Sequence, residues 1–186
     1  MRDRSVDGED SDFVESERQR PLPDVVALGM RLLLVGLNPS PASAASGVAF
    51  ARPGNRFWPA ALAANVVSRD RDPTHALVHH GVGFTDLVAR VTARADELAA
   101  DEYVEGAARL RLLVQQIEPA VVCFVGLTGY RIAIDKRAAV GWQRERFGDR
   151  DTYVMPNPSG INAHTNVGDL AQHLRAAAAG ATRHLD

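Results

Sequence analysis

The sequence contains very little cysteine and very little lysine. Among its 186 residues there is one cysteine, Cys123, and one lysine, Lys136. A single cysteine excludes an intrachain disulfide bond and an iron–sulfur cluster held by four thiolates. Cys123 lies within the apolar run 120–125, which is typical of a buried strand, so we expect a packing residue rather than a reactive thiol.

Long hydrophobic runs are also missing. No apolar stretch reaches the length of a membrane-spanning helix, and the first residues carry too many charges for a secretory signal peptide. We therefore expect a cytoplasmic protein without a membrane partner.

Charge is distributed unevenly along the chain. The formal net charge is −2, but residues 1–24 carry eight acidic residues and four arginines, which leaves a small basic excess in residues 25–186. The first 24 residues are polar and show no hydrophobic periodicity. We predict a disordered acidic leader over residues 1–24 and a single domain over residues 25–186. That domain can carry a local basic face despite the negative total.

Short apolar runs alternate with amphipathic segments over the rest of the chain. The run 31–37 stops at Asn38-Pro39, which is the pattern of a strand buried on both faces of a parallel sheet. Other strands are predicted at 120–125 and 152–156, and a short strand or an extended segment at 82–88. Helices are predicted at about 56–66, at 101–117, after a turn within 126–134, and from 166 or 168 to 179, with a short helical turn at 74–80 and a loop at 40–54. The alternation predicts an α/β fold, a three-layer sandwich with a largely parallel central sheet flanked by helices.

The tripeptide Asn-Pro-Ser occurs twice, at 38–40 and at 157–159, each time directly after a predicted buried strand. Ligands of open α/β sheets bind beyond the carboxyl ends of the strands, so the two copies can meet in one cleft. Proline also biases the preceding asparagine toward extended backbone, which keeps its side chain at the strand tip. Taken singly, each copy is better explained as a turn initiator, and only the pair in equivalent positions at strand ends favours a site.

Three blocks of the sequence together resemble a known family. Gly36–Ser40 resembles the Gly-Ile-Asn-Pro-Gly motif of the mismatch-specific uracil/thymine DNA glycosylases, and 157–164 is similar to that family's second motif, which begins Asn-Pro-Ser-Gly. Between them, Phe50–Trp58 is similar to the family's block Phe-Ala-x-Pro-x-Asn-Arg-Phe-Trp. The match runs in order from about residue 31 to residue 175. It implies a uracil-DNA glycosylase-like fold and a hydrolase that flips a damaged base out of DNA and leaves an abasic site.

The resemblance implies a role for each matched position. Asn38 would hold the water that attacks the sugar C1′, Phe50 would stack on the extruded base, and Ile161 would fill the vacated space in the duplex. Residues implied at the base are Gly36, Leu37, Phe50, Asn157 and Ser159, and those implied at the DNA are Ser40, Gly160, Ile161, Asn162, Ala163 and His164. His164 is equally well explained as a cap of the following helix, and Asn55 as a cap of the helix at 56–66.

These roles are physically reasonable. Extrusion costs a few kcal/mol, least for a mismatched base, and an aromatic platform returns about 1–3 kcal/mol by stacking. Backbone N–H groups aimed at the base oxygen stabilise the charge that develops as the glycosidic bond breaks. An asparagine amide cannot deprotonate water, but it can orient it.

Asp86 is a second candidate catalytic residue. An aspartate in this segment would assist the water as a general base or stabilise positive charge on the sugar. The alternative, an aspartate that caps a turn, is equally consistent with the sequence. Lys136 lies outside every motif, so an amine that would form a Schiff base is not expected, and a monofunctional enzyme is predicted. The six histidines show no metal-ligand spacing, so neither a metal nor a cofactor is predicted.

Two positions depart from the family pattern. Ser40 replaces the glycine that closes the first motif, and Ala163 stands where some members carry an arginine. The loss of that guanidinium can weaken the dependence on a mismatched guanine.

The expected partner is double-stranded DNA that contains uracil or a G:U or G:T mismatch, bound by a monomer. Thymine and other deaminated bases are further candidate substrates. The alternatives are a catalytically inactive module that binds damaged DNA and a small-molecule α/β enzyme that acts on nucleosides or esters. An esterase is disfavoured because Gly-x-Ser-x-Gly is absent, and a phosphate-binding NTPase because Gly-x4-Gly-Lys-Ser/Thr is absent.

Overall fold

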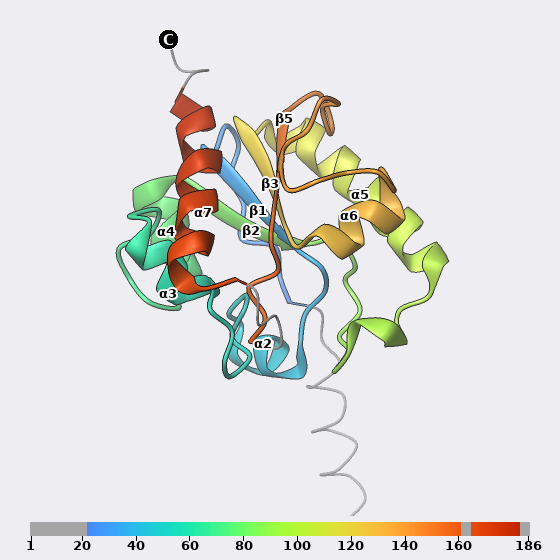
Figure 1. The fold of residues 1–186 in the computed structure, drawn as a ribbon, viewed down its shortest axis with the longest axis horizontal. Helices are drawn as coiled ribbons and strands as arrows, with labels where there is room; N and C mark the ends of the chain where they lie inside the picture. The colour runs from blue at the N-terminus through green and yellow to red at the C-terminus, as the bar shows by residue number, and fades with distance from the viewer. Residues whose placement is uncertain (1–21, 161–164, 183–186) are drawn as a thin grey trace, which may run out of the picture.

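The computed structural model describes residues 22–160 and 165–182 (Figure 1). Within them a five-stranded sheet has the strand order β2-β1-β3-β5-β4. The strands are β1 (Leu32–Gly36), β2 (Val82–Asp86), β3 (Val121–Val125), β4 (Gly141–Trp142) and β5 (Asp151–Met155). Neighbouring strands run parallel except β4, a two-residue edge strand that pairs antiparallel with β5.

Helices cover both faces of the sheet. The helices are α2 (Pro41–Ser46), α3 (Phe57–Ala63), α4 (Pro73–His80), α5 (Ala100–Ile117), α6 (Leu127–Ala133) and α7 (Val167–Thr182), with a 3-10 turn η1 (Ala95–Glu97). In Figure 1, α3, α4 and α7 lie on one side of the sheet and α5 and α6 on the other. The three-layer α/β sandwich predicted from the sequence is confirmed.

The alternation of side chains along β1 explains the two layers of the core. Leu32 and Leu34 belong to a hydrophobic cluster with residues of α3, α4 and α7, whereas Leu33 and Val35 belong to a second cluster with residues of α5 and α6. All five residues of β1 and of β3 are buried, as expected for strands covered on both faces. Cys123 in β3 is fully buried, and this burial raises the pKa of its thiol well above the ordinary range.

The segment 40–54, predicted as a loop, contains the short helix α2. Ser40 caps this helix, because its Oγ accepts a hydrogen bond from Ser43 N at 3.2 Å, and Pro41 occupies the first helical position. The helix predicted at 56–66 ends earlier, at Ala63, and Asn65 two residues later has a left-handed backbone with φ of 56°. A residue in that conformation cannot continue a right-handed helix.

Most of the predicted leader, residues 1–24, lies outside the described residues. Val25, at the start of the predicted domain, exchanges two backbone hydrogen bonds of 2.9 Å with Phe84 and so covers the open edge of β2. The Asp24 carboxylate accepts a hydrogen bond from Thr85 Oγ1. No helix in the described part of the chain is long and apolar enough to cross a membrane.

The connections of the sheet define where a ligand can bind. From β1 the chain crosses to β2 on one side, whereas from β3 it crosses to β5 on the other side. The loops after β1 and β3 therefore separate and leave a crevice at the carboxyl ends of these neighbouring strands.

Candidate active site

A pocket of ≈690 Å³ lies at the carboxyl ends of the strands. Its walls come from the loops that follow β1, β2 and β5, together with α2 and the segment that follows it. Predicted site residues that line it are Leu37, Asn38, Ser40, Phe50, Asp86, Asn157 and Ser159. The structure therefore brings the two Asn-Pro-Ser copies into one cavity, with the candidate carboxylate in the same space.

Asn38 follows β1 and is held by its amide nitrogen. Its Nδ2 donates hydrogen bonds to the main-chain oxygen of Arg90 at 2.9 Å and to Thr92 Oγ1 at 2.7 Å. Both acceptors belong to the loop after β2, whose start is joined to the end of β1 by the hydrogen bond from Val88 N to Leu37 O. Among the described residues no group donates to Asn38 Oδ1, so this acceptor is available to a water or a ligand.

Phe50 has a left-handed backbone, with φ of 58°, which is rare for a bulky residue. Two neighbouring hydrogen bonds fix it: Trp58 Nε1 donates to Ala49 O at 2.8 Å, and Ala51 N donates to Ser43 Oγ at 3.2 Å. The Phe50 ring stacks on Phe57 with centroids 4.2 Å apart. Phe50 is thus a fixed aromatic surface in the pocket wall, and the buried Trp58 is a packing residue.

Gly36 leaves space for the Asp86 side chain. The two residues are register partners in β1 and β2, and a Cβ on Gly36 would lie 2.1 Å from Asp86 Oδ1 and 3.4 Å from the Phe50 ring. A side chain at position 36 would therefore displace the carboxyl group. The carboxyl group of Asp86 accepts no hydrogen bond from the described residues, whereas the carboxyl group of a turn cap would accept one.

Charge around Asp86 is unusual. Burial raises the pKa of Asp86 to about 7, and repulsion from Asp24 raises it further, whereas the positive charge of Arg109 opposes both effects. Arg109 donates to the main-chain oxygen of Asp86 and lies 3.4 Å from the Asp24 carboxylate. Asp86 is therefore a carboxyl group whose protonation changes near neutral pH, which suits a group that exchanges protons.

The second Asn-Pro-Ser copy forms a tight turn. Asn157 Oδ1 accepts a hydrogen bond from Ser159 N at 2.9 Å, the side-chain turn that asparagine favours. Gly160 approaches Gly54 so closely that a Cβ on Gly160 would lie 2.8 Å from Gly54 O. The next predicted site residues, Ile161, Asn162, Ala163 and His164, lie outside the described residues.

Arg56 anchors this loop on both sides of the segment that is not described. Its Nη2 donates to Ser159 O at 2.8 Å, its Nη1 donates to Thr165 O, and its backbone N donates to Pro158 O at 3.0 Å. The Oδ1 of the preceding Asn55 accepts a hydrogen bond from Phe57 N, at the start of α3, at 2.9 Å, but the N-cap position of this helix is Arg56. Asn55 was predicted as the cap and instead lies one residue before it, while the contacts of Arg56 were not predicted from the sequence.

Replacing Arg56 with alanine is expected to lower stability by about 2 kcal/mol and to weaken binding of damaged DNA, because two charge-assisted hydrogen bonds are lost. Arg56→Lys keeps a positively charged donor and should give a smaller effect than alanine. It should not match the wild type, since one ammonium group lacks the two-pronged geometry. Thermal unfolding and titration with a uracil-containing duplex would measure both. Arg175→Ala is the matched control: it removes an arginine bond to Ala63 O on another face. Equal effects of the two alanine variants on DNA binding would contradict the inference that Arg56 holds a loop needed for binding.

Other predicted absences concern metals and amines. No group of three or more His, Cys, Asp or Glu residues in the described part of the chain is arranged to hold a metal ion. Lys136 is exposed just after α6 and does not line the pocket.

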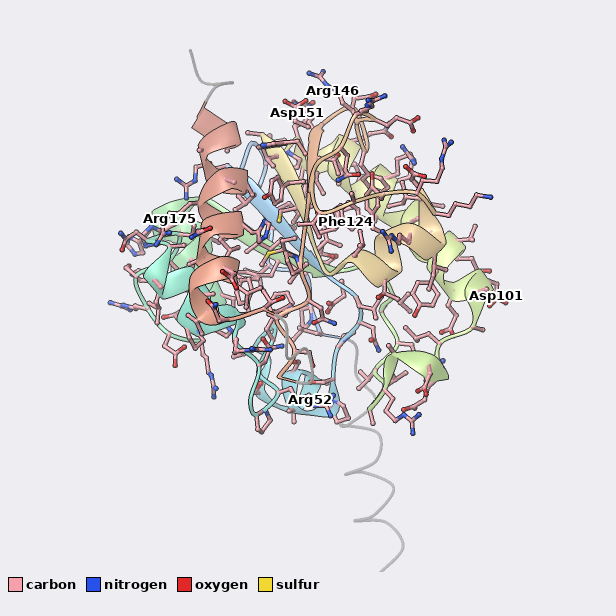
Figure 2. All side chains as sticks on the ribbon, viewed as in Figure 1. Arg52, Asp101, Phe124, Arg146, Asp151 and Arg175 are labelled. Carbon is pink, nitrogen blue, oxygen red and sulfur yellow. The ribbon has the colours of Figure 1, made fainter. Side chains whose placement is uncertain are left out.

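Two of the described arginines line the pocket. Arg52, beside α2 in Figure 2, makes no ion pair with a described carboxylate. Arg94 lines it too, but pairs with Asp96.

The pocket combines polar side chains with an aromatic wall and lies at the switch point of a largely parallel sheet, so the fold and the site are those of an α/β enzyme. The sequence profile of the uracil DNA glycosylase superfamily matches residues 23–179, most of the chain, and the protein belongs to that superfamily. This membership supports a DNA repair glycosylase, a hydrolase in the general sense.

Proposed function

We propose that the protein is a monofunctional DNA glycosylase that removes uracil from duplex DNA, with uracil opposite guanine as its preferred substrate. The observation that carries the proposal is the Asn38 amide, whose nitrogen is bound on the protein side and whose oxygen is left as an acceptor in the pocket. Superfamily membership supports the reaction class.

The extruded base would enter the pocket and stack on Phe50, whose other neighbour is Phe57. Stacking on an aromatic ring is worth about 1–3 kcal/mol per base and offsets part of the cost of extrusion. Because Phe50 is already fixed in a strained backbone, no ordering of this platform is needed on binding.

Asn38 Oδ1 would accept a hydrogen bond from the attacking water and aim its oxygen at the sugar C1′. The water must also lose a proton, which the ionised Asp86 would accept as a general base. The same carboxylate would stabilise the positive charge on the sugar as the glycosidic bond breaks. Arg52 at the pocket rim would contact a DNA phosphate, since a guanidinium fork suits that geometry.

Strand breakage is expected only after alkali treatment. A lyase step needs an amine that attacks C1′, and none of the described pocket residues is a lysine. The released product would therefore be DNA with an intact backbone and an abasic site, which hot alkali cleaves.

End-labelled duplexes with one uracil opposite guanine or adenine, a G:T duplex and a single-stranded uracil oligonucleotide test the proposal. We expect alkali-dependent cleavage that is fastest for uracil opposite guanine. Equal rates on all uracil substrates would retain the glycosylase but refute the mismatch preference. Binding of uracil DNA without cleavage would favour the alternative, a catalytically inactive DNA-binding module. Cleavage without alkali would refute the monofunctional mechanism.

A further inference from the structure

Thr92 is an almost completely buried polar residue beside the candidate catalytic asparagine, with 6% of its surface exposed. Its Oγ1 accepts a hydrogen bond from Asn38 Nδ2 at 2.7 Å and donates one to the main-chain oxygen of Arg94 at 2.8 Å. Its backbone N donates to Pro39 O at 3.2 Å. Thr92 therefore contacts the first Asn-Pro-Ser copy through both its side chain and its backbone.

The direction of these bonds follows from the number of protons available. A threonine hydroxyl has one proton, and here the Arg94 carbonyl, which can only accept, receives it. Toward Asn38 the hydroxyl can then act only as an acceptor. The Arg90 carbonyl at 2.9 Å and the Pro39 carbonyl at 3.4 Å, the other partners of Asn38 Nδ2, are also acceptors. Asn38 Nδ2 thus faces groups that all require an N–H donor.

A rotation of the Asn38 amide by half a turn would place Oδ1 against the Arg90 carbonyl and Thr92 Oγ1. Both hydrogen bonds would be lost and two oxygen pairs would repel, at a half-buried position where this arrangement is unfavourable. We propose that Thr92 is a positioning residue that fixes the orientation of the Asn38 amide, so that Oδ1 faces the reacting water. The inference rests on the proposed function of Asn38.

The Arg90 side chain is held by several hydrogen bonds, and these help to keep the Arg90 carbonyl in place beside Asn38. Its Nε and Nη2 donate to the two carboxylate oxygens of Glu102 at 2.7 and 2.8 Å, and Nη2 also donates to Glu97 O at 2.6 Å. The hydrogen bond from Arg90 lowers the pKa of Glu102 to about 2, so the pair stays charged in the neutral range. The first turn of α5 therefore holds the residue whose carbonyl binds Asn38.

The variants Thr92→Val and Thr92→Ser separate the hydroxyl from the shape of the side chain. Valine keeps the volume but removes the acceptor, and the rate of base release at saturating enzyme should fall roughly 10- to 100-fold. Serine keeps the hydroxyl and should restore most of the rate. Affinity for abasic product DNA should not change in either variant. Thr74→Val, on the exposed side of α4, is the matched control and should behave like the wild type.

A double variant and a spectrum make the test specific. In an Asn38→Ala background, Thr92→Val should have no additional effect, because the group it positions is gone. In ¹⁵N–¹H spectra of the wild type, the Asn38 side-chain amide protons, assigned by their loss in Asn38→Ala, should exchange more slowly than those of the exposed Asn166. This measurement needs no Thr92 variant to fold.

The possible outcomes distinguish this inference from the proposed function. Slow release in Thr92→Val, recovery in Thr92→Ser and slow exchange of the Asn38 amide support it. A Thr92→Val variant as fast as the wild type, with Asn38→Ala slow, overturns the inference and leaves the function standing. Fast exchange of the Asn38 amide in the wild type also overturns it. A wild type that releases no base, with a protected Asn38 amide, refutes the function but supports the orientation by Thr92.

Discussion

Replacing Asn38 with alanine is expected to lower the rate of base release by about 100- to 10,000-fold, the effect of losing the group that positions a reactant. The pocket keeps its aromatic wall and its carboxylate, but the water loses the acceptor that orients it. Of the two former partners, Thr92 Oγ1 belongs to a residue that lines the pocket and Arg90 O belongs to an exposed residue, so both can bind solvent instead. Folding should therefore be little affected.

Single-turnover kinetics with excess protein measure this effect, because they report the chemical step without product release. Binding of abasic duplex should match the wild type. Gln115→Ala, which removes an amide from the exposed surface of α5, is the control and should keep the full rate. If Asn38→Ala retained more than about a tenth of the wild-type rate, Asn38 would not be the residue that positions the water.

The fold could be predicted from the sequence because central strands such as β1 and β3 are nearly continuous runs of apolar residues. A run such as Leu32–Gly36, apolar at consecutive positions, is stable only where helices cover both faces of a sheet. The helix α2 was missed because Pro41–Ser46 is made of small residues without an apolar stripe. Its signal was present in the cap, since Ser40 followed by Pro41 is a typical helix start.

Part of the candidate site could be predicted from the same topology. Asn38 and Asn157 lie just after strand ends, Asp86 is the last residue of β2, and a parallel sheet brings the ends of its strands together. The supporting residues could not be predicted, because each acts across a long sequence separation. Thr92 binds a side chain 54 positions away, and Arg56 bridges carbonyls 103 and 109 positions away. Nothing in the local sequence of these residues indicates such contacts.

Asp24 is another residue whose long-range contacts could not be predicted from the sequence. It lies in the segment predicted as a leader, yet it binds Thr85, 61 positions away, and Arg109, 85 positions away. Its charge acts on the candidate catalytic carboxylate. The boundary predicted from composition, between residues 24 and 25, therefore leaves outside the domain a residue whose charge acts on Asp86.

Base release is expected to rise with pH through about 7 and to level off above it. A general base acts in its ionised form, and the pKa of Asp86 is raised to about 7. At two units below that value only about 1% of the carboxyl group is ionised, so the rate at pH 5 should be about 100-fold lower than the plateau. Asp86→Asn should lose the pH dependence together with most of the activity. A flat pH profile of the wild type would contradict the role of Asp86.

The raised pKa of Asp86 also affects stability. A rise in pH should increase the rate of base release but lower the free energy of unfolding. A carboxyl group whose pKa is raised on folding holds a proton in the native state that the unfolded chain releases. Between pH 4 and pH 7 the free energy of unfolding contributed by Asp86 therefore falls as the pH rises. Asp86→Asn cannot ionise, so its melting temperature relative to the wild type should increase over this range.

Two neighbours of Asp86 should move the pH profile in opposite directions. Asp24→Asn removes a repulsive charge, so the pKa of Asp86 should fall and activity should begin at lower pH. Arg109→Gln removes the opposing positive charge, so the pKa should rise and the profile should shift to higher pH. Full pH–rate profiles under single-turnover conditions would measure both. If the two variants shifted the profile in the same direction, the titrating group would not be the Asp86 carboxylate.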